Sequence, residues 1–363
     1  MRIAQLANFV GPTSGGLRRA VDKLGRGYVG AGHERLLIVP GPADSVVTSP
    51  QTGTVVTISS PALGSGYRMV LNTAKVRQVL DRFQPTSVEV SDKWTMSAAG
   101  LWARRHDVGS VLFSHERLDD QASMFLELEV AKPIHRLNRW LAKHYDRVVV
   151  TTRYSAGEWI DTKANLAIVP LGVDLTEFAP APRESGPGPQ LRLIYAGRLS
   201  REKSPHLAVA TAVELDRRGI GVQLNVFGTG PHIEELRTLA GDSPVFFHGY
   251  LDSRAALAEA YRSADIDLSV CPAETFGLAV LESLACGTPA VTADRGGARE
   301  LVDVSCAEWA SPDPVFLADA VLRMAGRLKS DEPGVRQAAR ACAERYPWDA
   351  SVAKMLAIHA ELS

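Results

Sequence analysis

The sequence has few cysteines, almost no net charge and no long hydrophobic run, and each shortage excludes a class of protein. Four cysteines in 363 residues are too few for a disulfide framework and lack the paired spacing of a metal site, so we expect reduced thiols. The 40 Lys and Arg against 41 Asp and Glu leave a net charge of −1, which provides no whole-protein field to attract nucleic acid. No apolar run could span a bilayer, and the first residues lead into a strand rather than a signal peptide. We therefore expect a cytoplasmic protein, long enough for two domains.

The first half of the chain alternates between strand-like and helix-like segments. An apolar strand at 2–10 leads into a glycine loop at 11–16, after which Leu17, Ala20, Val21 and Leu24 share one helical face. Further strands are predicted at 36–40, 55–59, 87–90, 110–114 and 147–151, and helices at 69–82, 97–106 and 130–145. This alternation is typical of a parallel sheet covered on both faces.

The same alternation of strands and helices is predicted in the second half of the chain, after a Pro- and Gly-rich linker or exposed loop at 180–189. Strands are predicted at 191–197, 222–228, 245–250, 266–272 and 290–293, and helices at 231–240, 254–264 and 277–286. Ser204 and Pro205 are typical of a helix start, with a capping side chain before a proline at the first helical position. We predict an α/β protein with domains at 1–175 and 176–346, and a final helix at 347–363 that packs back on the first domain.

The loops that follow the strands are where open α/β sheets bind ligands. Arg198 and Lys203 lie in such a loop, beside the predicted helix start at Ser204. A helix N-terminus offers unpaired N–H groups and partial positive charge, so two cations beside it favour a diphosphate site. The alternative is that these side chains are basic simply because the loop is solvated.

Two glutamates eight residues apart follow the strand at 266–272. Glu274 precedes a second helix start at Thr275, Phe276, Gly277 and Leu278, where its carboxylate can accept hydrogen bonds from sugar hydroxyls. Glu282 has apolar neighbours, and a hydroxyl-rich partner such as a ribose would explain a carboxylate there. The alternatives are a helix N-terminal acid for Glu274 and a solvent-facing position for Glu282.

These motifs, in their order, resemble those of the retaining glycosyltransferases of family 4. Glu274-x7-Glu282 enclosing Phe276-Gly277, followed by Ala285-Cys286-Gly287-Thr288-Pro289, resembles that family's nucleotide-sugar signature. The resemblance covers nearly the whole chain, through Gly15-Gly16, the segment 169–174, Gly197-Arg198-x4-Lys203 and the segment 247–250. It implies the GT-B fold, in which two Rossmann-like, doubly wound domains face a deep cleft.

Three segments narrow the resemblance to the actinobacterial GDP-mannose-dependent α-mannosyltransferases. They are the run 8–18, the run Ser114-His115-Glu116-Arg117-Leu118 and the run 274–278. This similarity implies GDP-mannose as donor, and a mannoside, an oligosaccharide or a phosphatidylinositol-mannoside glycolipid as acceptor. The alternatives are another donor, UDP-glucose or UDP-N-acetylglucosamine, with a soluble acceptor, or a non-catalytic protein that binds a nucleotide sugar.

The resemblance also implies a role for each candidate residue. Arg198 and Lys203 would hold the diphosphate and stabilise the charge that grows on it as the glycosidic bond breaks. The backbone from Thr275 to Leu278 would contact the phosphates, Glu274 the transferred sugar and Glu282 the ribose. His115 would stand near the donor sugar, although a histidine in that position is often only a structural hydrogen-bonding group.

Further expected contacts are those of the first glycine loop and of the nucleotide base. Gly16 would let its loop approach the phosphates or the acceptor. Gly249, Tyr250 and Asp252 would lie at the base, where a carboxylate suits the N–H donors of guanine; the alternative for Asp252 is a cap on the helix that starts near Ser253.

The expected chemistry needs neither a protein nucleophile nor a metal. The resemblance implies a same-face substitution in which the leaving phosphate helps to deprotonate the acceptor, rather than a carboxylate pair. Asp265 and Asp267 have the spacing of a metal motif, but they lie at the entry to a strand, where a structural role fits better. A dinucleotide oxidoreductase is excluded, because Ile233 stands where its G-x-G-x-x-G motif needs a third glycine after Gly228 and Gly230.

Contact with the inner membrane would need a local basic surface. The predicted helix from Lys75 to Arg82 has three cations and one acid, and it would either meet anionic headgroups at the cytoplasmic face or be an ordinary solvated helix. Lipid and soluble acceptors therefore both remain open.

Overall fold

The chain divides into two compact α/β units. A computed structural model describes residues 1–9, 15–63, 67–119, 131–182 and 190–363. Unit 1 comprises Met1–Leu171 and Trp348–Ser363, and unit 2 comprises Gly172–Pro347. Residue 10 of the predicted first strand, residues 11–14 of the predicted glycine loop, residue 130 of a predicted helix and residues 183–189 of the predicted linker lie outside the described residues.

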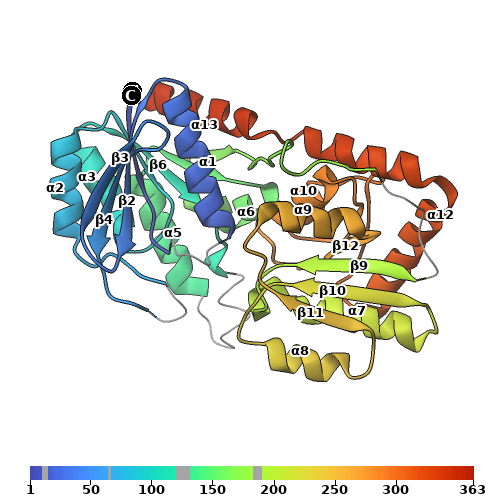
Figure 1. Ribbon diagram of the computed structural model, residues 1–363. Coiled ribbons are helices and arrows are strands. Elements are labelled where there is room, and N and C mark those ends of the chain that lie inside the picture. The colour runs from blue at the N-terminus through green and yellow to red at the C-terminus, as the bar shows by residue number, and fades with distance from the viewer. Residues whose placement is uncertain (10–14, 64–66, 120–130, 183–189) are drawn as a thin grey trace. The chain divides into compact units, whose positions relative to one another are not determined.

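Unit 1 is built on an eight-stranded sheet in the order β3-β4-β2-β1-β5-β6-β7-β8 (Figure 1). All neighbouring strands are parallel except β3, which runs antiparallel to β4. The strands are β1 (Arg2–Leu6), β2 (Glu34–Gly41), β3 (Ser45–Ser49), β4 (Gly53–Ser59), β5 (Ser87–Val90), β6 (Gly109–Ser114), β7 (Arg147–Val150) and β8 (Leu166–Ile168). The sequence pattern missed β3 and β8; β3 is an edge strand without a buried residue, so it has no apolar face to reveal it.

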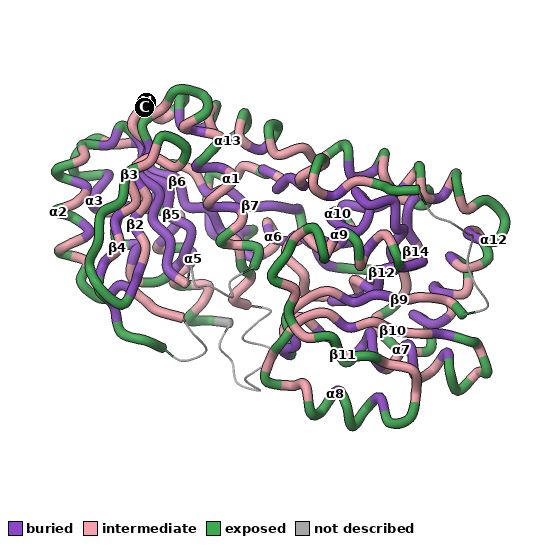
Figure 2. The backbone as a smooth tube through the Cα atoms, viewed as in Figure 1, coloured by how far each residue is buried: buried purple, intermediate pink, exposed green. Residues whose placement is uncertain are grey.

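The helices of unit 1 cover this sheet. They are α1 (Gly16–Gly30), α2 (Thr73–Phe83), η1 (Thr95–Ala98), α3 (Ala99–Arg105), α5 (Ala131–His144), α6 (Arg153–Ala156), η2 (Gly157–Thr162) and α13 (Trp348–Leu362). Helix α2 begins at Thr73 rather than at the predicted residue 69, because the Asn72 side chain accepts a hydrogen bond from the Lys75 N–H and caps the helix there. Figure 2 shows that buried residues follow the strands, whereas exposed residues lie on the outer sides of the helices.

Helix α13 is bound to the rest of unit 1 through a buried carboxylate. Glu89 on β5 accepts hydrogen bonds from Gln5 Nε2 at 2.8 Å and from the Tyr28 hydroxyl at 2.7 Å. His359 on α13 places Nε2 3.1 Å from the same carboxylate, and its Nδ1 lies 2.7 Å from the Ser87 hydroxyl. Because these groups are buried, leaving one of them unpaired would be costly, so the network fixes the position of α13.

Unit 2 has a six-stranded parallel sheet in the order β11-β10-β9-β12-β13-β14. The strands are β9 (Leu191–Ala196), β10 (Val222–Phe227), β11 (Val245–Gly249), β12 (Ile266–Ser269), β13 (Ala290–Ala293) and β14 (Ala307–Ala310). The helices are η3 (Arg201–Lys203), α7 (Pro205–Arg217), α8 (Ile233–Ala240), α9 (Arg254–Ser263), α10 (Leu278–Ala285), α11 (Gly297–Glu300) and α12 (Pro314–Glu344). The strand order reverses between β9 and β12, so the loops after these two strands lie where a doubly wound sheet binds its ligand.

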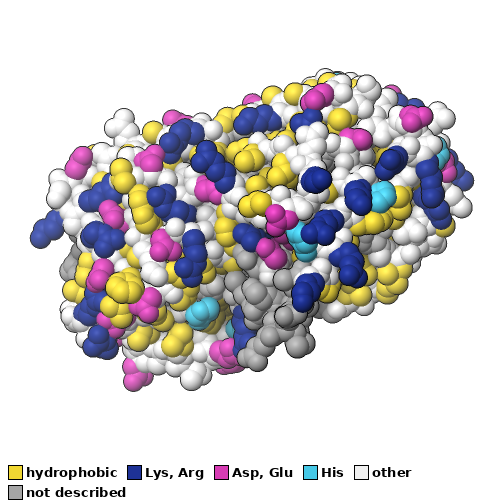
Figure 3. Space-filling model, turned by 180° about the vertical axis from the view of Figure 1, so that it is seen from behind, with side chains coloured by type: hydrophobic (Ala, Val, Ile, Leu, Met, Phe, Trp, Pro, Cys, Tyr) yellow, Lys and Arg dark blue, Asp and Glu magenta, His cyan; other side chains and the backbone are white. Residues whose placement is uncertain are grey.

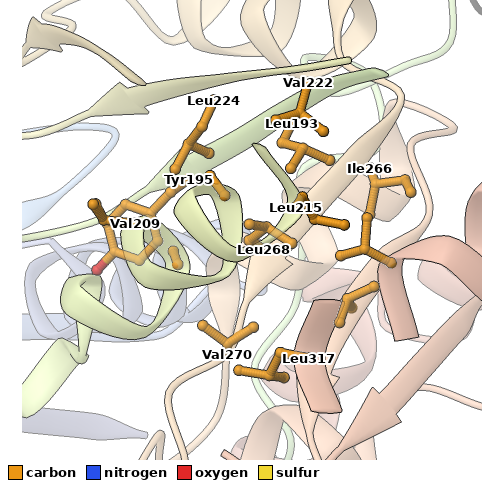
Figure 4. Close-up of a cluster of buried hydrophobic side chains, with 14 of the residues drawn as sticks. Leu193, Tyr195, Val209, Leu215, Val222, Leu224, Ile266, Leu268, Val270 and Leu317 are labelled. Carbon is orange, nitrogen blue, oxygen red and sulfur yellow. The ribbon is translucent and has the colours of Figure 1, made fainter. Parts of the chain in front are cut away.

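The core of unit 2 holds these two strands in place. Leu193 and Tyr195 from β9 pack with Ile266 and Leu268 from β12 and with apolar residues of α7 and α12, as Figure 4 shows. The Tyr195 hydroxyl is the oxygen at the edge of this cluster. Figure 3 shows that side chains of both charge signs lie on this face of the molecule.

Candidate active site

The loop after β9 carries both predicted cations. It runs from Gly197 through η3 to Ser204, and Pro205 occupies the first position of α7, as predicted. Ser204 is the N-cap residue of α7, as predicted, but its side chain does not cap the helix: the residue has a left-handed backbone (φ 48°), and its hydroxyl donates to the Arg201 carbonyl at 3.5 Å.

Two side chains fix this loop from the core. The buried Tyr195 places its hydroxyl 3.3 Å from the carbonyl oxygen of Arg198 and 3.2 Å from that of Lys203. The Cys271 thiol donates to the Glu202 carbonyl at 3.1 Å. The backbone positions of both cations therefore depend on one phenol, a role that the sequence pattern missed.

Two glycines after β10 let a second backbone approach the same loop. A Cβ on Gly228 would lie 1.9 Å from the Gly197 carbonyl oxygen, and one on Gly230 would lie 2.2 Å from that of Leu199. The Leu199 N–H donates to the Thr229 carbonyl at 3.0 Å. The Gly-x-Gly spacing that failed as a dinucleotide motif is thus explained by close backbone packing.

Both predicted cations have acidic partners. Arg198 Nη1 lies 3.4 Å from Glu202 Oε1, and Lys203 Nζ lies 2.8 Å from Glu274 Oε2. Burial disfavours the charged forms of both Lys203 and Glu274, but the attraction between the two charges outweighs this effect. The pKa of Lys203 is therefore raised and the pKa of Glu274 is lowered. The pair is therefore ionic at neutral pH, and a phosphate at Lys203 would replace or share the carboxylate.

The loop after β12 ends at the N-terminus of α10. Gly277 is the N-cap residue with φ 106°, a backbone conformation that favours glycine, and no acid lies in the first helical turn. Thr275 and Leu278 are partly buried, and Phe276 and Gly277 are buried. The first N–H groups of α10 have no partner within the helix, so this end is suited to an anion.

A third loop supports the second from behind, and the sequence analysis missed it. A Cβ on Gly296 would lie 2.7 Å from the Pro272 carbonyl oxygen, and one on Gly297 would lie 2.3 Å from that of Thr275. The Gly297 N–H donates to the Glu274 carbonyl at 2.5 Å. The signal in the sequence was the Gly296-Gly297 pair in the loop that follows β13.

Glu282 is buried, so its alternative placement on a solvent-facing side of the helix is wrong. Its side chain is 5% exposed, and Arg254 Nη1 on α9 lies 3.7 Å from its Oε1. Arg254 also pairs with Glu177 and lies over the Phe178 ring, 4.8 Å from the centroid. This arginine, which the sequence analysis did not single out, compensates the buried charge of Glu282.

The predicted base-binding residues follow β11, two strands away from β9. Gly249 ends the strand with φ 77°, Tyr250 is 55% exposed, and Asp252 is exposed. The alternative role of Asp252 as a helix cap is wrong, because Ser253 caps α9 by accepting from the Ala256 N–H at 3.3 Å.

His115 and Gly16 belong to unit 1. His115 follows β6 and stacks on Phe113 with ring centroids 4.1 Å apart, and its Nε2 is buried without a hydrogen-bond partner among the described residues. Burial lowers the pKa of His115 to about 4, so the ring is neutral at pH 7. Gly16 is the first residue of α1.

A buried ion pair holds the loop that contains His115. Lys93 pairs with Glu158, with side chains 4% and 1% exposed. Lys93 Nζ also donates to the Glu116 carbonyl at 3.1 Å, and Glu158 Oε1 accepts from the Leu118 N–H at 3.0 Å. The pair therefore fixes the backbone on the carboxyl side of His115.

The structure thus brings together one group of predicted residues and leaves others apart. Arg198, Lys203 and Glu274, with the start of α10, form a group at the β9–β12 switch point. Glu282 lies on α10 itself, whereas the base-binding candidates follow an edge strand and His115 lies in the other unit.

Comparison with known proteins identifies the family. The family described as Glycosyltransferase Family 4 matches residues 14–177, and the one described as Glycosyl transferases group 1 matches residues 190–327. The chain is 40% identical to a GDP-mannose-dependent alpha-(1-6)-phosphatidylinositol dimannoside mannosyltransferase of Mycobacterium tuberculosis, over 98% of this chain and 95% of the relative. It is 28% identical to a Glycogen synthase of the same species, over 92% of this chain and 87% of that protein.

Solved structures share the fold. Sucrose-phosphate synthase from Thermosynechococcus elongatus superposes with a TM-score of 0.79 at 21% identity, covering 100% of this chain and 99% of that one. Anabaena Alr3699/HepE, solved with UDP and glucose, gives 0.76 at 16% identity and covers 98% of both chains. Among the helices that the structure describes, none is long and apolar enough to cross a membrane. The chain belongs to glycosyltransferase family 4, with the two Rossmann-like units of the GT-B fold.

Proposed function

We propose that the protein transfers a mannosyl residue from GDP-mannose to a mannoside or phosphatidylinositol-mannoside acceptor, with retention of configuration. The 40% identity to a transferase named for this donor, over 98% of the chain, is the observation that carries the proposal. The site geometry supports it, because Arg198, Lys203 and the start of α10 offer positive charge at one end of the sheet.

In the proposed reaction, the charge that accumulates on the leaving diphosphate is met by groups already in place. Arg198 and Lys203 provide full charges, and the N–H groups at Phe276, Gly277 and Leu278 provide partial charges. Since the Tyr195 hydroxyl is hydrogen-bonded to the backbone carbonyls of Arg198 and Lys203, the loop that carries the two cations needs little rearrangement as the leaving group becomes charged. The proposal includes no metal ion.

Glu274 and Glu282 have binding roles in this mechanism. Glu274 would exchange part of its contact with Lys203 for sugar hydroxyls, and Glu282 would bind the ribose while Arg254 compensates its charge. His115, neutral at pH 7, would exchange hydrogen bonds with the sugar rather than act as an acid. The leaving phosphate takes the acceptor proton, so no carboxylate is needed as nucleophile.

A thermal-shift series with GDP, UDP and ADP tests the donor. Ligand that binds only the native state raises its stability with the logarithm of ligand concentration over Kd, so GDP should give the largest shift. Incubation with GDP-mannose and a mannoside acceptor then tests transfer. A larger shift with UDP than with GDP would contradict the donor assignment. If the protein binds GDP-mannose but neither transfers its mannosyl group nor slowly hydrolyses it, the protein is a binding protein rather than an enzyme.

A further inference from the structure

Two buried cysteines of unit 2 lie next to each other at the last turn of α12. Cys306 directly precedes β14 and Cys342 is on α12, and these residues are 0% and 3% exposed. Their sulfur atoms and a carboxylate oxygen of Asp303 all lie within 4.8 Å of one another. The sulfur atoms of a disulfide are about 2.05 Å apart, so side-chain rotation with a small backbone shift would bring the two cysteines into bonding distance.

Arg345 places a positive charge against one of these sulfur atoms. Its Nη2 lies 2.5 Å from Cys342 Sγ and 2.9 Å from Asp303 Oδ2. Hydrogen bonds from the Cys306 thiol and from Arg345 outweigh burial and lower the pKa of the Cys342 thiol. The hydrogen bond to Cys342 raises the pKa of Cys306, so Cys306 is the residue that keeps its proton. Because the thiolate is the reactive form of cysteine, Cys342 is the nucleophile of the two.

These groups are better arranged for oxidation of the thiols than for binding a cation. Arg345 already contacts both Cys342 and Asp303, and its positive charge would repel a metal ion at the same place. The other carboxylate oxygen of Asp303 accepts a hydrogen bond from the Ser305 N–H at 2.9 Å. The cluster therefore stabilises a thiolate rather than a second positive charge.

A small oxidant can reach Cys342 from the surface. The side chain of Arg345, which contacts the Cys342 sulfur, is 51% exposed, and that of Asp303 is 44% exposed. Hydrogen peroxide is close to water in size, so movement of the arginine side chain is enough to admit it. The other two cysteines differ, because burial raises the pKa of Cys271 to about 11 and that of Cys286 to about 12. Both therefore remain thiols at neutral pH and provide an internal comparison.

We propose that Cys306 and Cys342 form a redox-modification site, at which a peroxide converts the two thiols into a disulfide. The Cys342 thiolate attacks one peroxide oxygen, the O–O bond breaks, and the leaving hydroxide combines with the proton of the Cys342 thiol as water. A sulfenic acid remains on Cys342. The Cys306 sulfur then attacks the Cys342 sulfur, the S–O bond breaks, and the hydroxide leaves with the Cys306 proton as a second water. Each sulfur loses one electron, and each peroxide oxygen gains one.

The disulfide would tie the last turn of α12 to the segment that leads into β14. The Cys306 carbonyl accepts a hydrogen bond from the Ala290 N–H on β13 at 3.3 Å, so this end of the bond is anchored to the sheet. Cys342 lies shortly before Pro347, the last residue of unit 2. Because the bond closes the chain between 306 and 342 and restricts the unfolded state, it should raise the Tm of unit 2 by about 5 °C or more.

Thiol counting and mass spectrometry test the site. The reduced protein has four thiols, and after treatment with equimolar hydrogen peroxide two should remain when the protein is denatured and alkylated. The mass should fall by two hydrogen atoms, and a non-reduced digest should contain one peptide pair that joins Cys306 to Cys342. Dithiothreitol should restore all four thiols and return Tm to its starting value.

Substitutions separate the two steps of the reaction. Cys306→Ser should leave a sulfenic acid on Cys342 that dimedone labels, whereas Cys342→Ser should leave Cys306 unoxidised over the same time. Arg345→Gln should slow the loss of thiols by about tenfold, because a rise of one pKa unit lowers the thiolate fraction by about that factor. Arg323→Gln is the matched control: this arginine is also 51% exposed but pairs with Glu308, so the variant should be oxidised at the unaltered rate.

Three outcomes would overturn the proposal: four thiols after peroxide treatment of the unaltered protein, a disulfide that includes Cys271 or Cys286, or equal slowing in the two arginine variants. An unchanged Tm of the oxidised protein would refute the tethering of α12. Circular dichroism checks the folding of each variant. If Arg345→Gln does not fold, Arg345→Lys replaces it and should also be oxidised more slowly than the unaltered protein. None of these measurements involves glycosyl transfer, so the result is independent of the proposed function.

Discussion

Lys203 Nζ lies 2.8 Å from Glu274 Oε2, so two residues that the sequence assigned to different parts of the donor are partners in unit 2. Their side chains are 38% and 19% exposed, and ion pairs with this degree of solvent contact contribute about 1 kcal/mol or less. Under the proposed function, a diphosphate would therefore displace the carboxylate at low cost and would leave Glu274 to bind a sugar hydroxyl.

Replacing Lys203 by alanine should impair turnover far more than folding. Loss of one charge that stabilises a developing anion lowers kcat by about 100- to 1000-fold. The side chain is partly exposed, so Tm should change little. Steady-state rates and a melting curve measure the two effects, and Lys329→Ala, at an exposed lysine in the same unit, is the control. Unchanged turnover in the Lys203 variant would contradict its role.

The sequence located the loops of the site but not the contacts that shape them. Alternating strands and helices predict which loops gather at one sheet edge, and Arg198, Lys203 and Glu274 were singled out from that rule together with the resemblance to family 4. The Lys203–Glu274 pair joins residues 71 positions apart, which no local pattern reveals. The burial of Glu282 depends on how α9 packs on α10, which is a tertiary contact that the local sequence does not show.

The support of the site was the least predictable part. Tyr195 has the pattern of an ordinary core residue, and the direction of its hydroxyl follows from the path of the next loop. The left-handed backbone at Ser204 likewise overrides the capping preference of serine. Edge strand β3 was not predicted, because none of its residues is buried and its sequence therefore lacks the alternation of a strand with one face in the core.

Removing the Tyr195 hydroxyl should lower kcat while the fold persists. Tyr195→Phe keeps the buried ring but leaves the carbonyls of Arg198 and Lys203 without their shared donor, at a cost in stability of about 1 to 3 kcal/mol. We expect kcat to fall about tenfold or more, because both cations lose their fixed positions. Donor and acceptor KM values and Tm complete the measurement.

Tyr145→Phe is the matched control for this change. Tyr145 is as buried as Tyr195, and its hydroxyl donates to the Ser97 carbonyl at 2.8 Å in unit 1. Both variants should lose similar stability, but only the Tyr195 variant should lose turnover. Equal effects on turnover would show that Tyr195 has a general structural role.

A methyl group on Gly297 should disturb the site through the Glu274 loop. The added Cβ would lie 2.3 Å from the Thr275 carbonyl oxygen, so the loop between β12 and α10 must shift. We expect Gly297→Ala to lower kcat by about tenfold or more, since misplacement of about 1 Å is enough for such losses. Gly326→Ala is the control, because its Cβ meets nothing within 4 Å in α12 and should stabilise the helix by about 0.5 to 1 kcal/mol. Full activity in the Gly297 variant would show that the loop's position is unimportant.

Asp267 should make the stability of unit 2 decrease as the pH rises. Its Oδ1 is buried without a partner among the described residues, and its Oδ2 accepts from the Ser269 hydroxyl at 2.6 Å. Burial, with a smaller effect of the nearby Glu282 charge, raises the pKa of Asp267 to about 7. An unfolded aspartate has a pKa of about 3.9, so the native state binds more protons between these values. Stability is thus fully present below about pH 4 and is lost as the pH rises through 7, by up to about 4 kcal/mol.

Asp267→Asn isolates this effect, because the amide cannot ionise. Other buried groups also titrate, and His115 acts with the opposite sign since its pKa is lowered, so the difference in Tm between variant and unaltered protein is the informative quantity. The Tm of the variant relative to that of the unaltered protein should therefore rise from pH 5 to pH 8. Asp242→Asn, at an exposed carboxylate in the same unit, should show little change over that range. A pH-independent difference for Asp267→Asn would mean that the Asp267 carboxyl does not titrate in this window.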